Sequence, residues 1–160
     1  MEHRKQLIWI TLTICLAMAG CGDLLNINNL TLSVAEDITA GNFSSRFFKA
    51  NKDAKGILVE SYITPTTLSK TRILGVDKDI FTQNTDFEEV AYEMAKGLSN
   101  IAKANISVSI TGLAGSDIPT ANDGSYHACI IINYNNKEYI HVHEALHNSE
   151  LFLHNHIFRQ

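Results

Sequence analysis

The stretch Leu30-Thr-Leu-Ser-Val-Ala-Glu-Asp-Ile-Thr-Ala-Gly41 decides the fold, because it joins a strand pattern to a loop of small and polar residues. Residues 30–35 alternate between β-prone side chains, which predicts a strand. The loop that follows is expected to turn into a helix within residues 36–49, with Phe43, Phe47 and Phe48 on one helical face. Strand, loop and helix in this order are typical of a layered α/β domain.

The rest of the chain repeats this alternation. The predicted elements are a strand opening at residues 56–59 and ending before Pro65, a helix over 66–74 closed by Gly75, a helix over 86–103 capped by Asp86, a strand over 106–110, paired strands over 128–134 and 138–143 joined by Asn135-Asn136, and a helix over 149–158. The 86–103 helix is the clearest, with Val90, Met94, Leu98 and Ile101 on one face. The terminal hairpin makes the sheet mixed. We therefore expect an α/β fold, a three-layer α/β/α sandwich around a mixed sheet of about five strands.

The composition is that of one ordinary globular domain. The chain has 160 residues, 45% of them hydrophobic and 19% charged, which excludes a disordered or low-complexity chain. Its 13 Lys and Arg face 17 Asp and Glu, a net charge of −4, so no nucleic-acid partner is expected. Three cysteines are too few for a disulfide scaffold, and Cys129 is expected in the core. We expect no cofactor and no metal.

The N-terminal segment has two interpretations. His3-Arg4-Lys5, an apolar run over residues 7–19 and Met18-Ala-Gly-Cys21 together are typical of a lipoprotein signal. The run is short for a transmembrane helix, which needs about 20 apolar residues. Apolar residues also recur over positions 10–25 with the spacing of one helical face. We favour the helix, because cleavage would remove the first element of the domain.

This choice sets the expected domain organisation and location. Residues 1–29 form an N-terminal helix, or else a signal or lipoprotein-like segment, and residues 30–160 form the α/β domain. The expected location is cytoplasmic. The alternative is a lipoprotein anchored in the membrane through Cys21.

Two loops that follow strands are candidates for a ligand site. They are residues 36–41, after the first strand, and residues 111–116, after the third. Ligands of open α/β sheets bind beyond the carboxyl ends of the strands. Backbone N–H groups at the start of the first helix could hold an anion or a developing oxyanion.

Together the two loops resemble the signatures of the CinA C-terminal domain family, the nicotinamide mononucleotide deamidases. Val34-Ala-Glu-Asp-Ile-Thr-Ala-Gly41 resembles A-E-S-x-T-x-G, and Ser109-Ile-Thr-Gly-Leu-Ala-Gly115 resembles S-x-T-G-I-A-G-P. Between them, Leu68-Ser-Lys-Thr-Arg-Ile-Leu-Gly-Val76 is similar to A-K-x-x-x-L-G-V, and Glu88–Gly97 is similar to the helix before the second signature. The resemblance extends over roughly residues 10–145 and implies a three-layer α/β/α sandwich.

The resemblance also implies a reaction and a set of site residues. Family members hydrolyse the carboxamide of nicotinamide mononucleotide, and a lysine activates the serine that attacks it. Lys70 stands at the position of that lysine, Asp37 stands at the position of the serine, and Thr39 is the remaining hydroxyl of the first loop. The substrate-binding positions implied are Glu36, Ala40, Gly41, Thr111, Gly112 and Gly115.

Several positions depart from the family pattern. An ionised Asp37 is a poor nucleophile toward an amide, and we expect it to form an ion pair with Lys70 and to cap the following helix. Other departures are Pro65 near a family tyrosine, Ser116 in place of a proline, Asp123-Gly-Ser-Tyr126 in place of Lys-Pro-Val-Gly, and His154 and Arg159 as the nearest candidates for the family's arginines.

The predicted function is therefore that of an amidase-family domain with an impaired or inactive site. The expected partner is a small nucleotide similar to nicotinamide mononucleotide, and a homo-oligomer is possible. The alternative function is a non-catalytic nucleotide-binding module or a lipoprotein binding module.

A rival motif occurs near the C-terminus. His143-Glu-Ala-Leu-His147 matches H-E-x-x-H, which on a helix binds zinc and provides a glutamate base. Here His141 and His143 are expected at the end of a strand, where they share one face and could bind metal only adventitiously. His154 is also one residue beyond the place that an extended zinc motif requires. A zinc metalloprotease is accordingly a remote alternative.

Overall fold

A computed structural model describes residues 21–82, 84–112, 125–134 and 137–146 of the chain. Its elements are α2 (Cys21–Ile27), β1 (Leu32–Glu36), α3 (Asn42–Ala50), α4 (Ala54–Ile57), β2 (Leu58–Ile63), α5 (Thr67–Leu74), η1 (Lys78–Ile80), α6 (Phe87–Ala102), β3 (Ile106–Gly112), β4 (Ser125–Tyr134) and β5 (Lys137–Leu146). The strands form one sheet in the order β2-β1-β3-β4-β5. Strand β1 is parallel to β2 and β3, whereas β4 runs antiparallel to β3 and β5.

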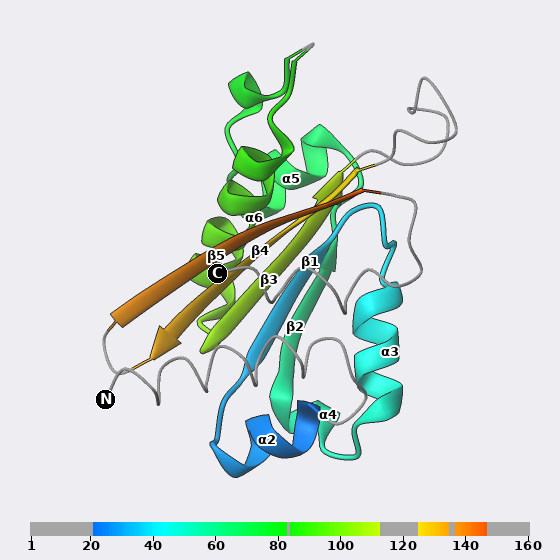
Figure 1. Cartoon of the computed structure of the whole chain (residues 1–160), viewed down its shortest axis with the longest axis vertical. Helices are drawn as coiled ribbons and strands as arrows, with labels where there is room; N and C mark the ends of the chain where they lie inside the picture. Colours follow the sequence, from blue (N-terminus) through cyan, green and yellow to red (C-terminus); the bar gives the residue numbers. More distant parts are fainter. Residues whose placement is uncertain (1–20, 83, 113–124, 135–136, 147–160) are drawn as a thin grey trace.

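Helices cover both faces of this sheet (Figure 1). Leu25, Phe47 and Ile57 of α2, α3 and α4 share one apolar cluster with Val34 and Ile106 of the sheet. On the opposite face, α5 and α6 contribute two further clusters, whose sheet residues are Ala35, Cys129 and Ile131. The predicted three-layer sandwich with a mixed sheet is therefore confirmed, as is the buried position of Cys129.

Local capping explains where α5 and α6 begin and end. Thr66 and Ser69 form a reciprocal capping box at the start of α5, and Gly75 ends the helix with a φ of 71°. The Asp86 side chain accepts hydrogen bonds from the N–H groups of Glu88 and Glu89 at the start of α6. The caps at Gly75 and Asp86 were predicted from the sequence, whereas the capping box of Thr66 and Ser69 was not.

Other details differ from the sequence-based expectation. Residues 54–57 form helix α4, so β2 begins at Leu58 rather than at Gly56. Phe48 and Ile101 are exposed, because their helices pack on the sheet through a narrower face than the sequence pattern indicated. Strand β5 continues to Leu146, beyond the predicted end at His143. The predicted 135–136 turn, the 149–158 helix and most of the N-terminal segment lie outside the described residues.

Among the described residues, no helix combines the length and the apolar character that crossing a bilayer requires.

The two helices of the α5/α6 layer approach one another closely at Gly97. A Cβ atom at this position would lie 1.8 Å from the backbone oxygen of Leu74. Small residues let α6 approach the sheet in the same way, since Ser33, Ser107 and Ser109 are fully buried beneath it. The Ser109 hydroxyl donates to the carbonyl oxygen of Ala91, at 2.5 Å.

We predict that Gly97→Ala destabilises the fold, because the methyl group would force α5 away from α6; overpacking of this kind costs about 1–3 kcal/mol. Gly56→Ala is the matched control, since nothing lies within 4 Å of the Cβ there. It should be neutral or slightly stabilising. Urea denaturation of the two variants and the wild type measures the difference, and equal midpoints for both variants would contradict the close approach.

Candidate functional site

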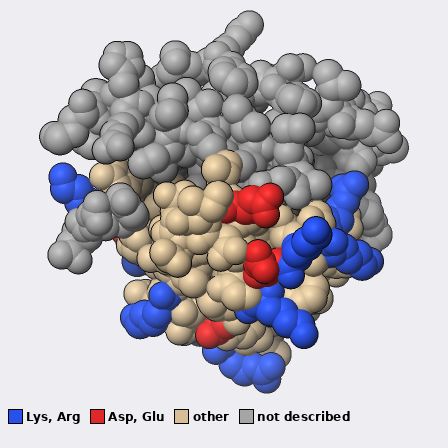
Figure 2. Space-filling view, turned by 90° about the horizontal axis from the view of Figure 1, so that it is seen from below, with Lys and Arg blue, Asp and Glu red and all other residues tan. Residues whose placement is uncertain are grey.

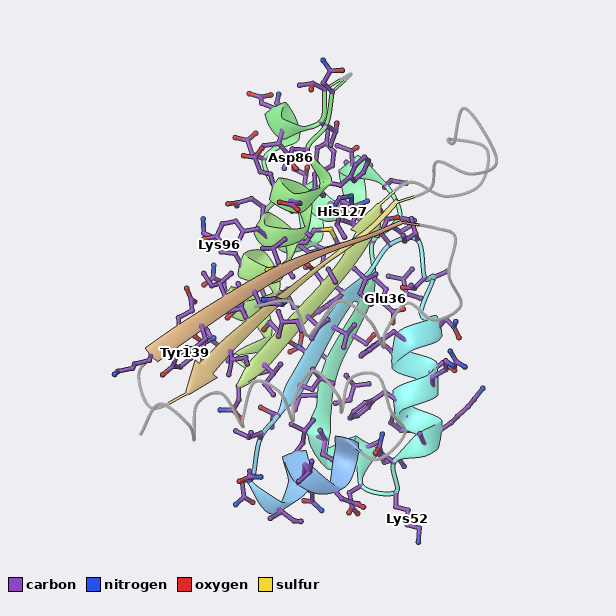
Figure 3. All side chains as sticks on the ribbon, viewed as in Figure 1. Glu36, Lys52, Asp86, Lys96, His127 and Tyr139 are labelled. Carbon is purple, nitrogen blue, oxygen red and sulfur yellow. The ribbon has the colours of Figure 1, made fainter. Side chains whose placement is uncertain are left out.

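Two consecutive carboxylates, Glu36 and Asp37, lie at the carboxyl end of β1, and their side chains point to opposite faces of the sheet. Strand alternation sends the Glu36 side chain to the α3 layer, between β1 and the start of that helix (Figure 3). The Asp37 side chain instead contacts Lys70 of α5 and Thr111 of β3. The candidate site is built from these contacts.

Glu36 is fully buried and saturated with hydrogen bonds from its own chain. Oε1 accepts from the N–H of Ser44 at 2.8 Å and from its hydroxyl at 2.6 Å. Oε2 accepts from the N–H of Phe43 at 3.0 Å and from the Thr39 hydroxyl at 2.5 Å. Burial alone would raise the pKa of Glu36, but the hydrogen bonds of Ser44, Thr39 and Phe43 together lower it below its ordinary value. Glu36 is therefore held as a carboxylate.

Glu36, and not Asp37, caps helix α3. The expectation that Asp37 caps this helix is wrong, because the N–H groups of Phe43 and Ser44 donate to Glu36. The N–H of Asn42 donates to the carbonyl oxygen of Thr39. These three donors at the helix start are thus already used within the chain, so any bound anion would have to meet other donors.

Asp37 and Lys70 form a buried ion pair, as predicted. Lys70 Nζ lies 2.8 Å from Asp37 Oδ2, and the two side chains are 6% and 12% exposed. The Thr111 hydroxyl donates to the same Oδ2 atom at 2.9 Å, and the Asp37 N–H donates to the carbonyl oxygen of Ile110 at 3.0 Å. Asp37 therefore joins β1, β3 and α5 at one point.

The remaining first-loop residues shape the turn. Ala40 and Gly41 have φ angles of 48° and 87°, a left-handed conformation that reverses the chain into α3. The Thr39 hydroxyl donates to Glu36, so its proton is directed away from the Lys70 pair. Direct ligand contacts of Glu36, Ala40 and Gly41 stay predictions.

The second loop is described only where it leaves the sheet. Thr111 is buried, and Gly112, at the end of β3, has a φ of 147°. Gly115, Ser116, His154 and Arg159 lie outside the described residues.

His127 is a further polar residue of the site, next to Thr111, and the sequence analysis did not identify it. It lies on β4 directly opposite Thr111, is buried, and stacks on the Phe87 ring with centroids 5.8 Å apart (Figure 3). Asp37, Thr111 and His127 thus follow one another across three neighbouring strands. Only the antiparallel register places His127 there, and no local motif marks it.

The zinc-motif interpretation does not fit the structure. His143 and Glu144 belong to strand β5, which continues to Leu146, so this part of the motif lacks the helical spacing that zinc binding needs. His147 lies outside the described residues. Within the part of the chain that the structure describes, no three His, Cys, Asp or Glu side chains are grouped to hold a metal ion.

Comparison with known proteins identifies the family. Residues 17–152 match the model of the CinA C-terminal domain, so the chain belongs to this family. A putative competence-damage inducible protein of Alkaliphilus oremlandii is 39% identical over 54% of this chain and 21% of its own length. A CinA-like protein of Chlorobaculum tepidum is 39% identical over 58% of this chain and 22% of its own length. The chain thus aligns with about a fifth of the length of these relatives.

Solved structures of the same superfamily share the fold. A CinA superfamily protein of Escherichia coli matches with a TM-score of 0.61 and 26% identity, over 78% of this chain and 73% of the other. The competence/damage inducible protein CihA of Agrobacterium tumefaciens matches with a TM-score of 0.67 and 21% identity, over 82% and 79%. At 21% identity the second likeness bears on the fold alone.

Glu36→Gln should destabilise the fold at neutral pH, because the amide group places donors against the donors of Ser44 and Phe43; a buried unsatisfied group costs about 1–3 kcal/mol. The pKa of Glu36 is lowered on folding, so its charge stabilises the fold above its ordinary pKa of 4.5. That stabilisation is lost as the pH falls through the lower folded pKa. Unfolding of both proteins between pH 7 and pH 3 should therefore show a shrinking difference.

Glu88→Gln is the control for this prediction, since Glu88 is exposed. A difference between wild type and Glu36→Gln that stays constant with pH would contradict a charged cap.

Breaking the Asp37–Lys70 pair from one side should be strongly destabilising. Asp37→Ser would leave the Lys70 ammonium buried without its partner, which costs about 3–5 kcal/mol. The double variant Asp37→Ser/Lys70→Met should recover most of this loss, because no buried charge remains. A double-mutant cycle by chemical denaturation measures the coupling, and additive effects would show that the two side chains do not depend on each other.

Proposed function

We propose that this chain is a CinA-family domain that binds a nucleotide similar to nicotinamide mononucleotide without hydrolysing its carboxamide. The contact between Lys70 Nζ and Asp37 Oδ2, at 2.8 Å, is the observation that carries the proposal. It occupies the position where the family resemblance implies a lysine next to a serine nucleophile.

The ion pair removes both parts of the expected chemistry. A carboxylate has no proton to give up and is a weak nucleophile toward an amide carbon. A lysine that acts as a base must be neutral, but here the ammonium is bound to a carboxylate in a buried setting. Activation of any hydroxyl by Lys70 would first require this pair to separate.

The hydroxyl groups nearby do not replace the serine. The Thr111 hydroxyl donates to Asp37, and Thr111 itself is fully buried. The Thr39 hydroxyl donates to Glu36 in the other layer of the site. Glu36 nonetheless fixes the loop that follows β1, and Asp37 joins this loop to the end of β3, which supports ligand binding without turnover.

We predict that the wild type releases no ammonia from nicotinamide mononucleotide at typical enzymatic rates of about 1–1000 per second. Isothermal titration calorimetry with the same nucleotide should detect binding. The double variant Asp37→Ser/Lys70→Met provides a matched control, since it removes the ammonium of the site without leaving a buried charge unpaired. Turnover in the wild type would overturn the catalytic half of the proposal.

Absence of binding in the calorimeter would overturn the other half. The two measurements are independent, so either part of the proposal can fail alone.

A further inference from the structure

Charged side chains separate toward two ends of the molecule. Acidic residues outnumber the basic Lys78 around η1 and the first turn of α6, where they are Asp77, Asp79, Asp86, Glu88 and Glu89. Basic residues gather in α3, α4 and the turn between them, namely Arg46, Lys49, Lys52 and Lys55. Asp86 and Lys52 mark the opposite ends of the long axis in Figure 3. The described part of the molecule thus has a strong charge asymmetry, although the net charge of the whole sequence is only −4.

The basic end also exposes apolar side chains. Ile27 is 76% exposed, Phe48 45% and Leu24 39%. Their helices are held together, because the Gly22 N–H donates to Asn51 Oδ1 at 2.7 Å. We name the surface formed by Leu24, Ile27, Arg46, Phe48, Lys49, Lys52 and Lys55 the basal surface.

Figure 2 looks onto this end of the molecule and shows blue side chains spaced around a tan area, with red side chains also lying on this area. The carboxylates of α2 and of the turn before α4 are Asp23 and Asp53, and Asp53 accepts a hydrogen bond from Asn26 at 2.8 Å. Positive charge therefore exceeds negative charge on the basal surface.

We propose that the basal surface binds anionic lipid membranes. Four cations within ten residues reach the number that typically attracts a segment to an anionic leaflet. Exposed Leu, Ile and Phe side chains at the same end as such cations are typical of surfaces that insert into the boundary between headgroups and acyl chains. Phosphates of a nucleic acid would meet the cations but would leave this hydrocarbon without a partner.

The charge asymmetry orients the molecule on such a membrane. The acidic end is repelled by the lipid phosphates while the basal surface is attracted. Glu36 and the Asp37–Lys70 pair lie at the carboxyl end of β1, whereas α2 and α4 lie near the opposite end of the sheet (Figure 1). A molecule bound through the basal surface thus keeps its candidate ligand site facing the solution.

Vesicle flotation tests the proposal with the full chain. Vesicles of phosphatidylcholine with phosphatidylglycerol should bind the wild type, and binding should weaken with salt; vesicles of phosphatidylcholine alone should not. The triple variant Lys49→Glu/Lys52→Glu/Lys55→Glu should bind at least about tenfold more weakly. Arg72→Glu/Lys78→Glu/Lys96→Glu makes the same change in net charge away from the basal surface and should bind like the wild type. Circular dichroism verifies that both variants are folded.

A second variant tests the apolar part. Ile27→Ser/Phe48→Ser should bind anionic vesicles more weakly than the wild type while keeping the same dependence on salt, since no charge changes. Equal losses in both triple variants, equal binding to neutral vesicles, or no binding at all would overturn the proposal. Tighter binding to duplex DNA than to anionic vesicles would overturn it in favour of a nucleic-acid surface.

Discussion

Alternation along β1 sends Glu36 and Asp37 to opposite faces of the sheet, and each carboxylate meets donors from a different layer. Glu36 holds the first turn of α3 through the N–H groups of Phe43 and Ser44. Asp37 holds α5 through Lys70. The two helical layers are therefore each held by one of two neighbouring residues at the end of the same strand.

Each of these carboxylates depends energetically on the partners that the chain provides for it. A buried carboxylate without hydrogen bonds is costly, and both carboxylates here are paired by the chain itself. The pair of Asp37 and Lys70 adds little stability compared with a well-packed apolar pair, but losing one partner exposes the whole desolvation cost of the other. The structure therefore tolerates joint replacement at this site better than single changes.

Much of the fold follows from local signals in the sequence. The caps at Thr66, Gly75 and Asp86 are short-range patterns, and they place α5 and α6 correctly. The family resemblance placed Asp37 beside Lys70, which lies on a different element.

The expectations that failed depend on tertiary structure. Gly56 and Ile57 were predicted to begin a strand, yet they belong to helix α4, and Ile57 packs in the core. The assignment of the α3 cap to Asp37 was wrong, because the N–H of Ser44 at the helix start donates to Glu36, the last residue of the strand. His127 joins the site only through the pairing of β3 with β4, a register that no short motif encodes.

On the proposed function, an aspartate in place of the family's serine beside the buried Lys70 exchanges reactivity for charge balance. A base-like lysine next to a hydroxyl has no counterion, so burial opposes its charged form and keeps it reactive. A carboxylate in the same place pairs with the ammonium and accepts a hydrogen bond from Thr111, so the carboxyl ends of β1 and β3 stay joined. Active sites commonly trade stability for activity in the opposite direction. On the function proposed above, this chain keeps the architecture of a ligand site because the residue that ends the chemistry also secures the fold around it.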